Sequence, residues 1–279
     1  MPLSFAPHAP CNQQKVLTLV LTLAMLLSVM VVGAGAATFG DQESITNKEA
    51  VDVCTTLNII GGYEDGTFRP NGNVTRAEMS KMICVALNGG QEPTMGSGLI
   101  ATFNDVAKDH WAAPYIEYCV SQGIVGGVGG GNFNPTGNIT GTQAAKMLLC
   151  ILGYNASIQG YVGSDYWETN INVDAAQKGL YAGLTNLDAS APLTRDQAAQ
   201  MIWNALNAYE VEYKTTLVAG PDGTLTSKVT VQDKVVGTTN DKITLLEDKY
   251  EAKTFVGTFN GNTDTLGLKK GYIQVEGAL

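Results

Sequence analysis

The chain has 279 residues, of which 44% are hydrophobic and 15% are charged, a composition that predicts a folded rather than a disordered protein. Its formal net charge of -9 argues against nucleic-acid binding, because a phosphate backbone would repel it and no basic cluster offsets the charge. With only two histidines, the chain also offers little for catalysis by a nucleophile, a histidine and an acid.

The first 37 residues are typical of an export leader. Lys15 precedes an uncharged apolar run that begins at Val16 and ends in small residues, as in a secretory signal peptide. We expect cleavage after Ala36 or Ala37, and no membrane span after cleavage. The run is also long enough for an uncleaved anchor helix, and either alternative places the rest of the chain outside the cytoplasm.

A first helix is predicted over residues 46–57, opening on a capping box of Thr46 with Glu49. A loop rich in glycine and charge follows at residues 61–78, with the sequence GGYEDGTFRPNGNVTRAE. Its last four residues, 75–78, form a second capping box, which predicts the start of a second helix.

The same elements recur 65 residues later. A helix is predicted over residues 111–122, and the loop GGVGGGNFNPTGNITGTQ at residues 126–143 aligns with residues 61–78 without a gap and with eight identical residues. It too ends in a capping box, TGTQ, at residues 140–143. The chain therefore contains an internal repeat.

A third capping box, TRDQ at residues 194–197, marks a degenerate third copy. Its first helix is predicted over residues 173–182, with Gly179 in the place of the small residue Cys54 of the first copy. After each of the three boxes, apolar residues recur at helical spacing. They are Met79, Met82, Ile83, Ala86 and Leu87, then Ala144, Met147, Leu148, Ile151 and Leu152, then Ala198, Met201, Ile202, Ala205 and Leu206.

Four cysteines follow the leader, which itself contains Cys11. They are Cys54, Cys84, Cys119 and Cys150. Each lies in an apolar helical pattern, where a free cysteine packs as a small apolar residue. In an exported protein, bridges joining the first to the second and the third to the fourth are the alternative.

From about residue 211 the chain becomes rich in threonine, valine and turn signals, and alternation at residues 228–231 and 272–275 predicts short strands. The predicted fold class is mainly α, with a β-rich C-terminal segment that looks like the beginning of a further domain. The predicted parts are the signal peptide at 1–37, repeats at 38–100, 101–160 and 161–210, and the β-rich segment at 211–279.

Two stretches resemble the S-layer homology family. FNDVAKDHWAAPYIEYCVSQGIVGG at residues 103–127 is similar to the first half of the family pattern, and residues 61–78 are similar to the second half. The resemblance covers about residues 39–210 and implies three units in a pseudo-threefold helical spindle, with ligand grooves between neighbouring units. It also implies non-covalent attachment of a secreted protein to cell-wall polysaccharide, often through pyruvylated sugars.

Arg76 and Arg195 each occupy the first helical position after a capping threonine. We expect them beside free backbone N–H groups at the positive end of a helix dipole, where a guanidinium can bind a pyruvyl carboxylate bidentately. Without the resemblance, a solvated or acid-paired arginine is the alternative. Gly141 takes this position in the middle unit, so we expect the weakest ligand contact there. Gly141→Ala is expected to leave the ligand affinity nearly unchanged and to steady the helix.

Four further residues complete the predicted polysaccharide site: Trp111, Asp105, Asp65 and Arg69. Trp111 is expected either to stack on a sugar or to pack in the core. Asp105, like Asp41, is expected either to cap the segment that follows it or to contact sugar. No metal or other cofactor is expected.

The predicted function is a non-enzymatic anchor at the cell wall or S-layer. Its expected partners are pyruvylated cell-wall polysaccharide and other S-layer subunits. The alternative is an anchored extracellular enzyme, such as a polysaccharide hydrolase, whose catalytic part lies in or beyond the C-terminal segment.

Overall fold

The structure is a computed structural model of the chain, and it describes residues 38–93, 101–219, 221, 224–238, 240–254, 259–262 and 273–275. The predicted signal peptide at 1–37, including Cys11, lies outside these residues. In the described ranges no helix combines the length and the apolar character needed to cross a membrane.

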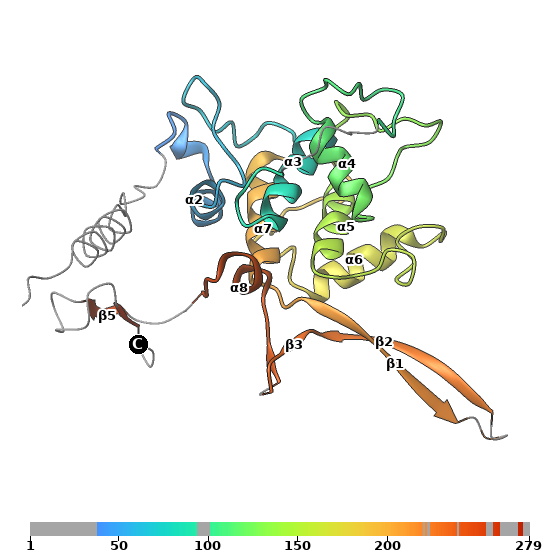
Figure 1. The fold of residues 1–279 in the computed structure, drawn as a ribbon. Helices are drawn as coiled ribbons and strands as arrows, with labels where there is room; N and C mark the ends of the chain where they lie inside the picture. The colour runs from blue at the N-terminus through green and yellow to red at the C-terminus, as the bar shows by residue number, and fades with distance from the viewer. Residues whose placement is uncertain are drawn as a thin grey trace, which may run out of the picture. The chain divides into compact units, whose positions relative to one another are not determined.

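Residues 38–210 form what we call the helical body, and the α-helices in its described part come in three pairs (Figure 1). The first helices of the pairs are α2 (Lys48–Thr56), α4 (Ala113–Ser121) and α6 (Trp167–Gln177). The second helices are α3 (Arg76–Leu87), α5 (Gly141–Ile151) and α7 (Arg195–Asn207). A short 3-10 helix, η1 (Gln42–Ser44), precedes the first pair. Each pair falls within one of the predicted units.

The three units are interlaced. Helix α2 packs mainly against α7, α4 against α3, and α6 against α5, so each first helix rests on the second helix of another unit. Helix α5 also contacts both α3 and α7. The core is therefore shared among the units and does not belong to any one of them.

A closed ring of backbone hydrogen bonds joins the units at their centre. The N–H of Val74 donates to the carbonyl of Leu193 at 2.9 Å, Leu193 donates to Ile139 at 2.8 Å, and Ile139 donates to Val74 at 2.9 Å. All three residues are buried, and each directly precedes the capping threonine of a second helix. This ring gives the helical body the pseudo-threefold arrangement that the resemblance implies.

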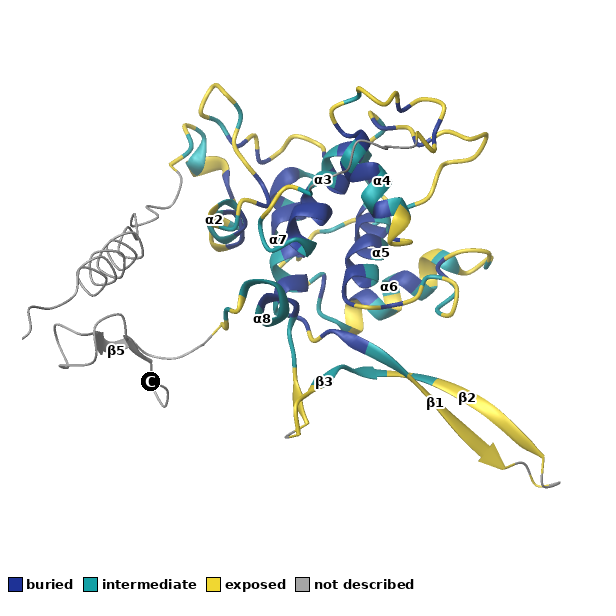
Figure 2. Cartoon of the chain, viewed as in Figure 1, coloured by how far each residue is buried: buried dark blue, intermediate teal, exposed yellow. Residues whose placement is uncertain are grey.

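The second helices form as predicted. The capping boxes at Thr75, Thr140 and Thr194 have both reciprocal hydrogen bonds. The apolar positions predicted for the three helices are all buried except Leu87, which is partly buried. Buried residues, dark blue in Figure 2, run along α3, α5 and α7. These predictions are confirmed. They could be made from the sequence because the capping box and the apolar positions both lie close to each helix start.

The predicted capping box of Thr46 with Glu49 is wrong. Helix α2 begins at Lys48, and its N-cap residue Asn47 makes no capping bond through its side chain. Instead, Oδ1 of Asp196 accepts the N–H groups of Thr46 and Asn47, each at 3.0 Å. The cap thus comes from α7, in another unit.

The helix predicted over residues 173–182 is also misplaced, since α6 covers Trp167–Gln177. Ala175, and not Gly179, takes the small buried position, and its carbonyl accepts the N–H of Leu180 just as that of Cys54 accepts the N–H of Ile59. Gly179 has a φ of 71° and lies beyond the helix end, where a left-handed residue terminates a helix.

The cysteines of the helical body are free thiols. Cys54, Cys84 and Cys119 are buried and Cys150 is partly buried. Burial raises the pKa of the Cys54 thiol to about 12, so it stays protonated. The free-thiol prediction therefore holds in this structure, and the bridged alternative does not.

The described residues of the C-terminal segment form three antiparallel strand pairs: β1 (Val211–Ala219) with β2 (Leu225–Asp233), β3 (Val235–Val236) with β4 (Asp241–Lys242), and β5 (Phe259–Asn262) with β6 (Ile273–Val275). In the first pair Val211 lies opposite Asp233 and Ala219 opposite Leu225. The strand predicted at residues 228–231 is part of β2, and the one predicted at 272–275 includes β6, with residue 272 outside the described residues.

This segment also contains a helix that the sequence reading missed, α8 (Leu245–Tyr250), which packs against α7. Thr244 and Glu247 form its capping box. The sequence TLLE has the same capping-box pattern as the three confirmed boxes at Thr75, Thr140 and Thr194. The composition around it favours strands and so masks this helix signal.

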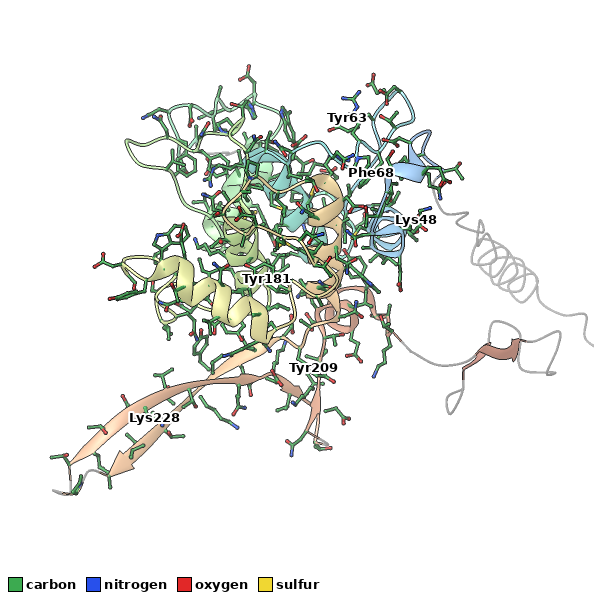
Figure 3. All side chains as sticks on the ribbon, turned by 180° about the vertical axis from the view of Figure 1, so that it is seen from behind. Lys48, Tyr63, Phe68, Tyr181, Tyr209 and Lys228 are labelled. Atoms are coloured by element: carbon green, nitrogen blue, oxygen red, sulfur yellow. The ribbon has the colours of Figure 1, made fainter. Side chains whose placement is uncertain are left out.

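The base of the β1–β2 hairpin is attached to the helical body. The N–H of Val211 donates to the carbonyl of Leu152 at 2.7 Å, and Lys178 forms an ion pair with Asp233 at 2.7 Å. Farther from this base the strands are mostly exposed, as around Lys228 in Figure 3.

Candidate functional site

The starts of the second helices dock onto the loops of neighbouring units. The N–H groups of Arg76 and Arg195 donate to the carbonyls of Gly137 and Gly72, each at 2.9 Å. The next N–H of each helix donates to a proline carbonyl in the same loop, at 3.1 Å in both cases. The expectation of free N–H groups at these helix starts is therefore wrong, and these N–H groups are not available to a ligand.

The Arg76 guanidinium ties the first unit to the second. Its Nε donates to the carbonyl of Phe133 at 2.8 Å and its Nη2 to that of Gly126 at 2.9 Å, with the guanidinium carbon 4.5 Å from the centre of the Phe133 ring. Burial lowers the pKa of Arg76, and the nearby charge of Asp105 opposes this. Arginine nevertheless stays charged in proteins, so Arg76 provides a partly exposed cation.

Arg195 makes the same two contacts with the loop of the first unit. Its Nε donates to Phe68 at 2.9 Å and its Nη2 to Gly61 at 2.7 Å. Its guanidinium carbon also lies over the rings of Tyr63 and Phe68, the two aromatic residues labelled in that loop in Figure 3. Arg195 is only 5% exposed. A role of Arg195 in ligand binding stays a prediction. Its contacts give it a structural role, because they join α7 to the loop of the first unit.

Beside Arg76 is a hollow of about 190 Å³ that residues of all three units line. Gly126 and Gly127 line it, together with Lys146 of α5 and Trp167 of α6. It is smaller than the roughly 300–1,000 Å³ of pockets that enclose drug-sized ligands, which suits contact with one part of a polymer. Where the structure describes the chain, no carboxylate forms an ion pair with Lys146.

A second set of residues occupies the equivalent positions of the repeat. Lys81 lies 65 residues before Lys146, each five residues after the first position of its helix. Trp111 and Trp167 likewise lie eight residues before the small buried Cys119 and Ala175. We call the hollow the Lys146 groove (Arg76, Lys146, Trp167) and, from the repeat equivalence, name the second set of residues the Lys81 groove (Arg195, Lys81, Trp111).

The third equivalent set has neither cations nor an aromatic ring. Gly141, Gln200 and Thr46 occupy the positions of the arginine, the lysine and the tryptophan. Gly141 is buried, and a Cβ added there would lie 3.0 Å from Cα and 3.3 Å from the carbonyl oxygen of Ala189. The degenerate loop of the third unit thus fills the space that an arginine side chain takes in the other two.

This close approach argues against the expectation that Gly141→Ala steadies the helix, while the expectation of an unchanged ligand affinity stays a prediction. We now expect the substitution to lower the free energy of unfolding by about 1–2 kcal/mol, because overpacking outweighs the gain in helix propensity. Urea denaturation measures the change. Gly61→Ala is the control, since no atom lies within 4 Å of a Cβ built there. A Gly141→Ala protein as stable as the wild type would contradict the crowding.

Trp111 is 53% exposed and precedes α4, so the alternative that placed it in the core is wrong. Its ring stacks on that of His110, at 5.8 Å between centroids, and lies 6.4 Å from that of Tyr115. The indole is therefore open to a ligand. Sugar stacking stays a prediction.

Asp41 and Asp105 bind loop backbone and do not cap the segments that follow them. The carboxylate of Asp41 accepts the N–H groups of Phe68 and Arg69, each at 2.8 Å, which hold its pKa below the usual value. Asp105 accepts those of residues 133–134 at 2.8 and 2.7 Å. Burial raises the pKa of Asp105, but these bonds outweigh that effect and lower it.

Asp65 and Arg69 pair with each other at the tip of the first loop. Oδ1 of Asp65 accepts the hydroxyl of Thr67 at 2.6 Å, and Oδ2 accepts Nη2 of Arg69 at 2.8 Å. These bonds, the one from Thr67 first, hold the pKa of Asp65 far below its usual range. Both charged side chains are about half exposed, at 50% and 51%, and their ligand role stays a prediction.

Sequence reasoning missed Lys81, Lys146 and Trp167. The signal was present, because the two lysines are one repeat apart and lie outside the apolar stripe of their helices.

In the described ranges, no three His, Cys, Asp or Glu side chains gather closely enough to hold a metal ion.

Comparison with known proteins identifies relatives of this helical body. The S-layer homology domain matches residues 38–80 and 102–145. A cell surface protein of Thermoanaerobacter kivui is 30% identical over 204 residues, covering 72% of this chain and 26% of that protein. A surface layer protein of Brevibacillus choshinensis is 26% identical over 285 residues, covering 95% of this chain and 25% of that protein.

An enzyme is also among the relatives. An amylopullulanase of Thermoanaerobacterium thermosulfurigenes is 31% identical over 183 residues, which cover 61% of this chain and 9% of the enzyme. The chain thus spans about a quarter or less of the length of these three relatives. The family match lies within the first two units. That the third unit is a further copy of the repeat stays a prediction, and the ring of hydrogen bonds that it shares with the other two units supports it.

Proposed function

The chain belongs to the S-layer homology family through its domains at residues 38–80 and 102–145, and we propose that it anchors a cell-surface protein non-covalently to cell-wall polysaccharide. It acts outside the cytoplasm, at the cell wall or surface, as the names of its relatives indicate. The shared helical body is the anchoring part, and the ligand binds between units.

The observation that carries this proposal is the Lys146 groove. A partly exposed arginine, a lysine without an ion-pair partner among the described residues and a tryptophan line one small hollow. The cations favour an anionic group, and the indole offers an apolar face to a sugar ring. A carboxylate on a sugar, as in a pyruvyl ketal, combines both features.

The groove also explains how a chain of net charge -9 binds an acidic polymer. Exposed charges more than about 10 Å apart are largely screened at physiological salt. The local pair of Arg76 and Lys146 therefore decides whether the ligand is held, and the net charge does not.

A second candidate function follows from the amylopullulanase relative. In this alternative the helical body anchors an extracellular enzyme whose catalytic part is encoded elsewhere in the same reading frame. The sequence of the complete reading frame separates the two candidates. A hydrolase domain in it would favour the enzyme, and further structural domains alone would favour the anchor.

The anchoring proposal predicts binding to purified, pyruvylated wall polysaccharide, and a loss of affinity when the pyruvyl groups are removed chemically. One charge-assisted contact is worth roughly 1.5–3 kcal/mol, or about 10- to 150-fold in affinity. Lys146→Ala should cause a loss in the same range, measured by calorimetry. Equal binding before and after depyruvylation would remove the carboxylate from the mechanism.

The control variant is Lys214→Ala. Lys214 is an exposed lysine on β1, outside the helical body, so it matches Lys146 in charge and not in place. Its replacement should leave the affinity unchanged. An equal loss for both lysines would indicate a nonspecific effect of charge and would contradict the groove.

A further inference from the structure

The Lys81 groove already holds a carboxylate, that of the protein's own Glu92. Oε1 of Glu92 lies 2.9 Å from Nζ of Lys81, and Oε2 accepts the hydroxyl of Tyr115. Lys81 also lies over the Tyr115 ring, at 5.2 Å from its centroid. One carboxylate is thus bound by a cation and a hydroxyl beside the exposed Trp111.

The Lys146 groove lacks such a carboxylate. One repeat after Glu92 the chain has Ser157, which carries no charge. Tyr115 also has no counterpart there, because Ile171 of α6 lies four residues after Trp167, as Tyr115 lies four residues after Trp111. Both grooves therefore have a lysine and an indole. They differ in that the carboxylate of Glu92 pairs with the lysine of the Lys81 groove.

We propose that Glu92 is a built-in competitor that takes the place of the ligand's carboxylate in the Lys81 groove. This rests on the proposed function, because it presumes that a carboxylate on a sugar is the ligand of these grooves. The protein then has two unequal sites, the open Lys146 groove and the Lys81 groove, which the ligand enters by displacing Glu92.

The exposure of the pair makes this displacement feasible. The side chains of Lys81 and Glu92 are 40% and 59% exposed, and exposed ion pairs are weak. Glu92 nevertheless competes well because it belongs to the same chain, which gives it a high effective concentration at Lys81. Tyr115 is 8% exposed and held within α4, so its hydroxyl stays in place when Glu92 leaves.

The tryptophans report on each groove separately. The protein has three tryptophans, and each gives one indole N–H signal in a ¹H–¹⁵N spectrum. The signal of Trp111 reports on the Lys81 groove, that of Trp167 on the Lys146 groove, and that of Trp203 on α7. The probe is a pyruvylated disaccharide released from wall polysaccharide, with the depyruvylated disaccharide as its control. In the wild type we expect the Trp167 signal to shift at lower probe concentration than the Trp111 signal.

Glu92→Gln should tighten the binding that Trp111 reports by roughly tenfold, which is about 1.4 kcal/mol, and leave that reported by Trp167 within twofold. Glu92→Ala should act in the same direction. Glu43→Gln is the control, since Glu43 is 98% exposed and only loosely paired with Lys48 at 3.9 Å.

An unchanged Trp111 affinity in both Glu92 variants, with normal binding at Trp167, would overturn the competitor and leave the proposed function intact. A probe that shifts neither indole in any of the proteins would overturn the proposed function, and the competitor with it.

Discussion

Replacing Arg195 with alanine is expected to destabilise the protein by about 3–5 kcal/mol. The substitution removes two charge-assisted hydrogen bonds that join α7 to the loop of the first unit, and it leaves the carbonyls of Phe68 and Gly61 without these donors. It also removes the guanidinium from two aromatic rings. Denaturation by urea, followed by circular dichroism, measures the loss.

Arg69→Ala is the matched control. Arg69 also lies over Tyr63, at 4.0 Å, but it is exposed and its guanidinium bonds only locally, to Asp65 and Thr67 of its own loop. Its replacement should cost less than about 1 kcal/mol, as is usual for surface pairs. Arg195→Lys should lie closer to alanine than to wild type, since an ammonium lacks the planar fork that reaches both carbonyls. Equal stability of the Arg195→Ala and Arg69→Ala proteins would contradict the role of Arg195 as a tie.

The second helices were predictable because their determinants are local. The box of Thr140 with Gln143 and the apolar stripe that follows lie within a dozen residues, and the 65-residue repeat showed the pattern more than once. The start of α2 was not predictable in this way. Its cap is the carboxylate of Asp196, which lies 150 residues away from Thr46 in the sequence.

The site was predicted only in part, for the same reason. The residue types at helix starts could be read directly, but their hydrogen-bond partners belong to other units. The sequence placed Arg195 beside a ligand, and the structure adds that two of its donors bind carbonyls of a loop more than a hundred residues away. Lys81 and Lys146 were within reach of the repeat pattern, but a lysine inside a helix is normally a solvated surface residue.

The interlaced packing leads to the other prediction with a large effect. Residues 38–100, expressed alone, should be unfolded. In the whole protein α2 packs on α7 and is capped by Asp196, while α3 packs on α4 and α5. All of these partners lie outside residues 38–100. The fragment also loses the ring of hydrogen bonds in which Val74 takes part.

What remains in the fragment is two short helices without their main partners. Isolated helices shorter than about 12–15 residues are marginal in water, and a repeat that shares its core with neighbours cannot bury its apolar face alone. α2 has 9 residues and α3 has 12, so circular dichroism should show little helix and no cooperative melt. Residues 38–254, which retain α8 against α7, should melt cooperatively under the same conditions. A sharp melt of the 38–100 fragment would mean that each unit has its own core, contrary to the packing of α2 on α7.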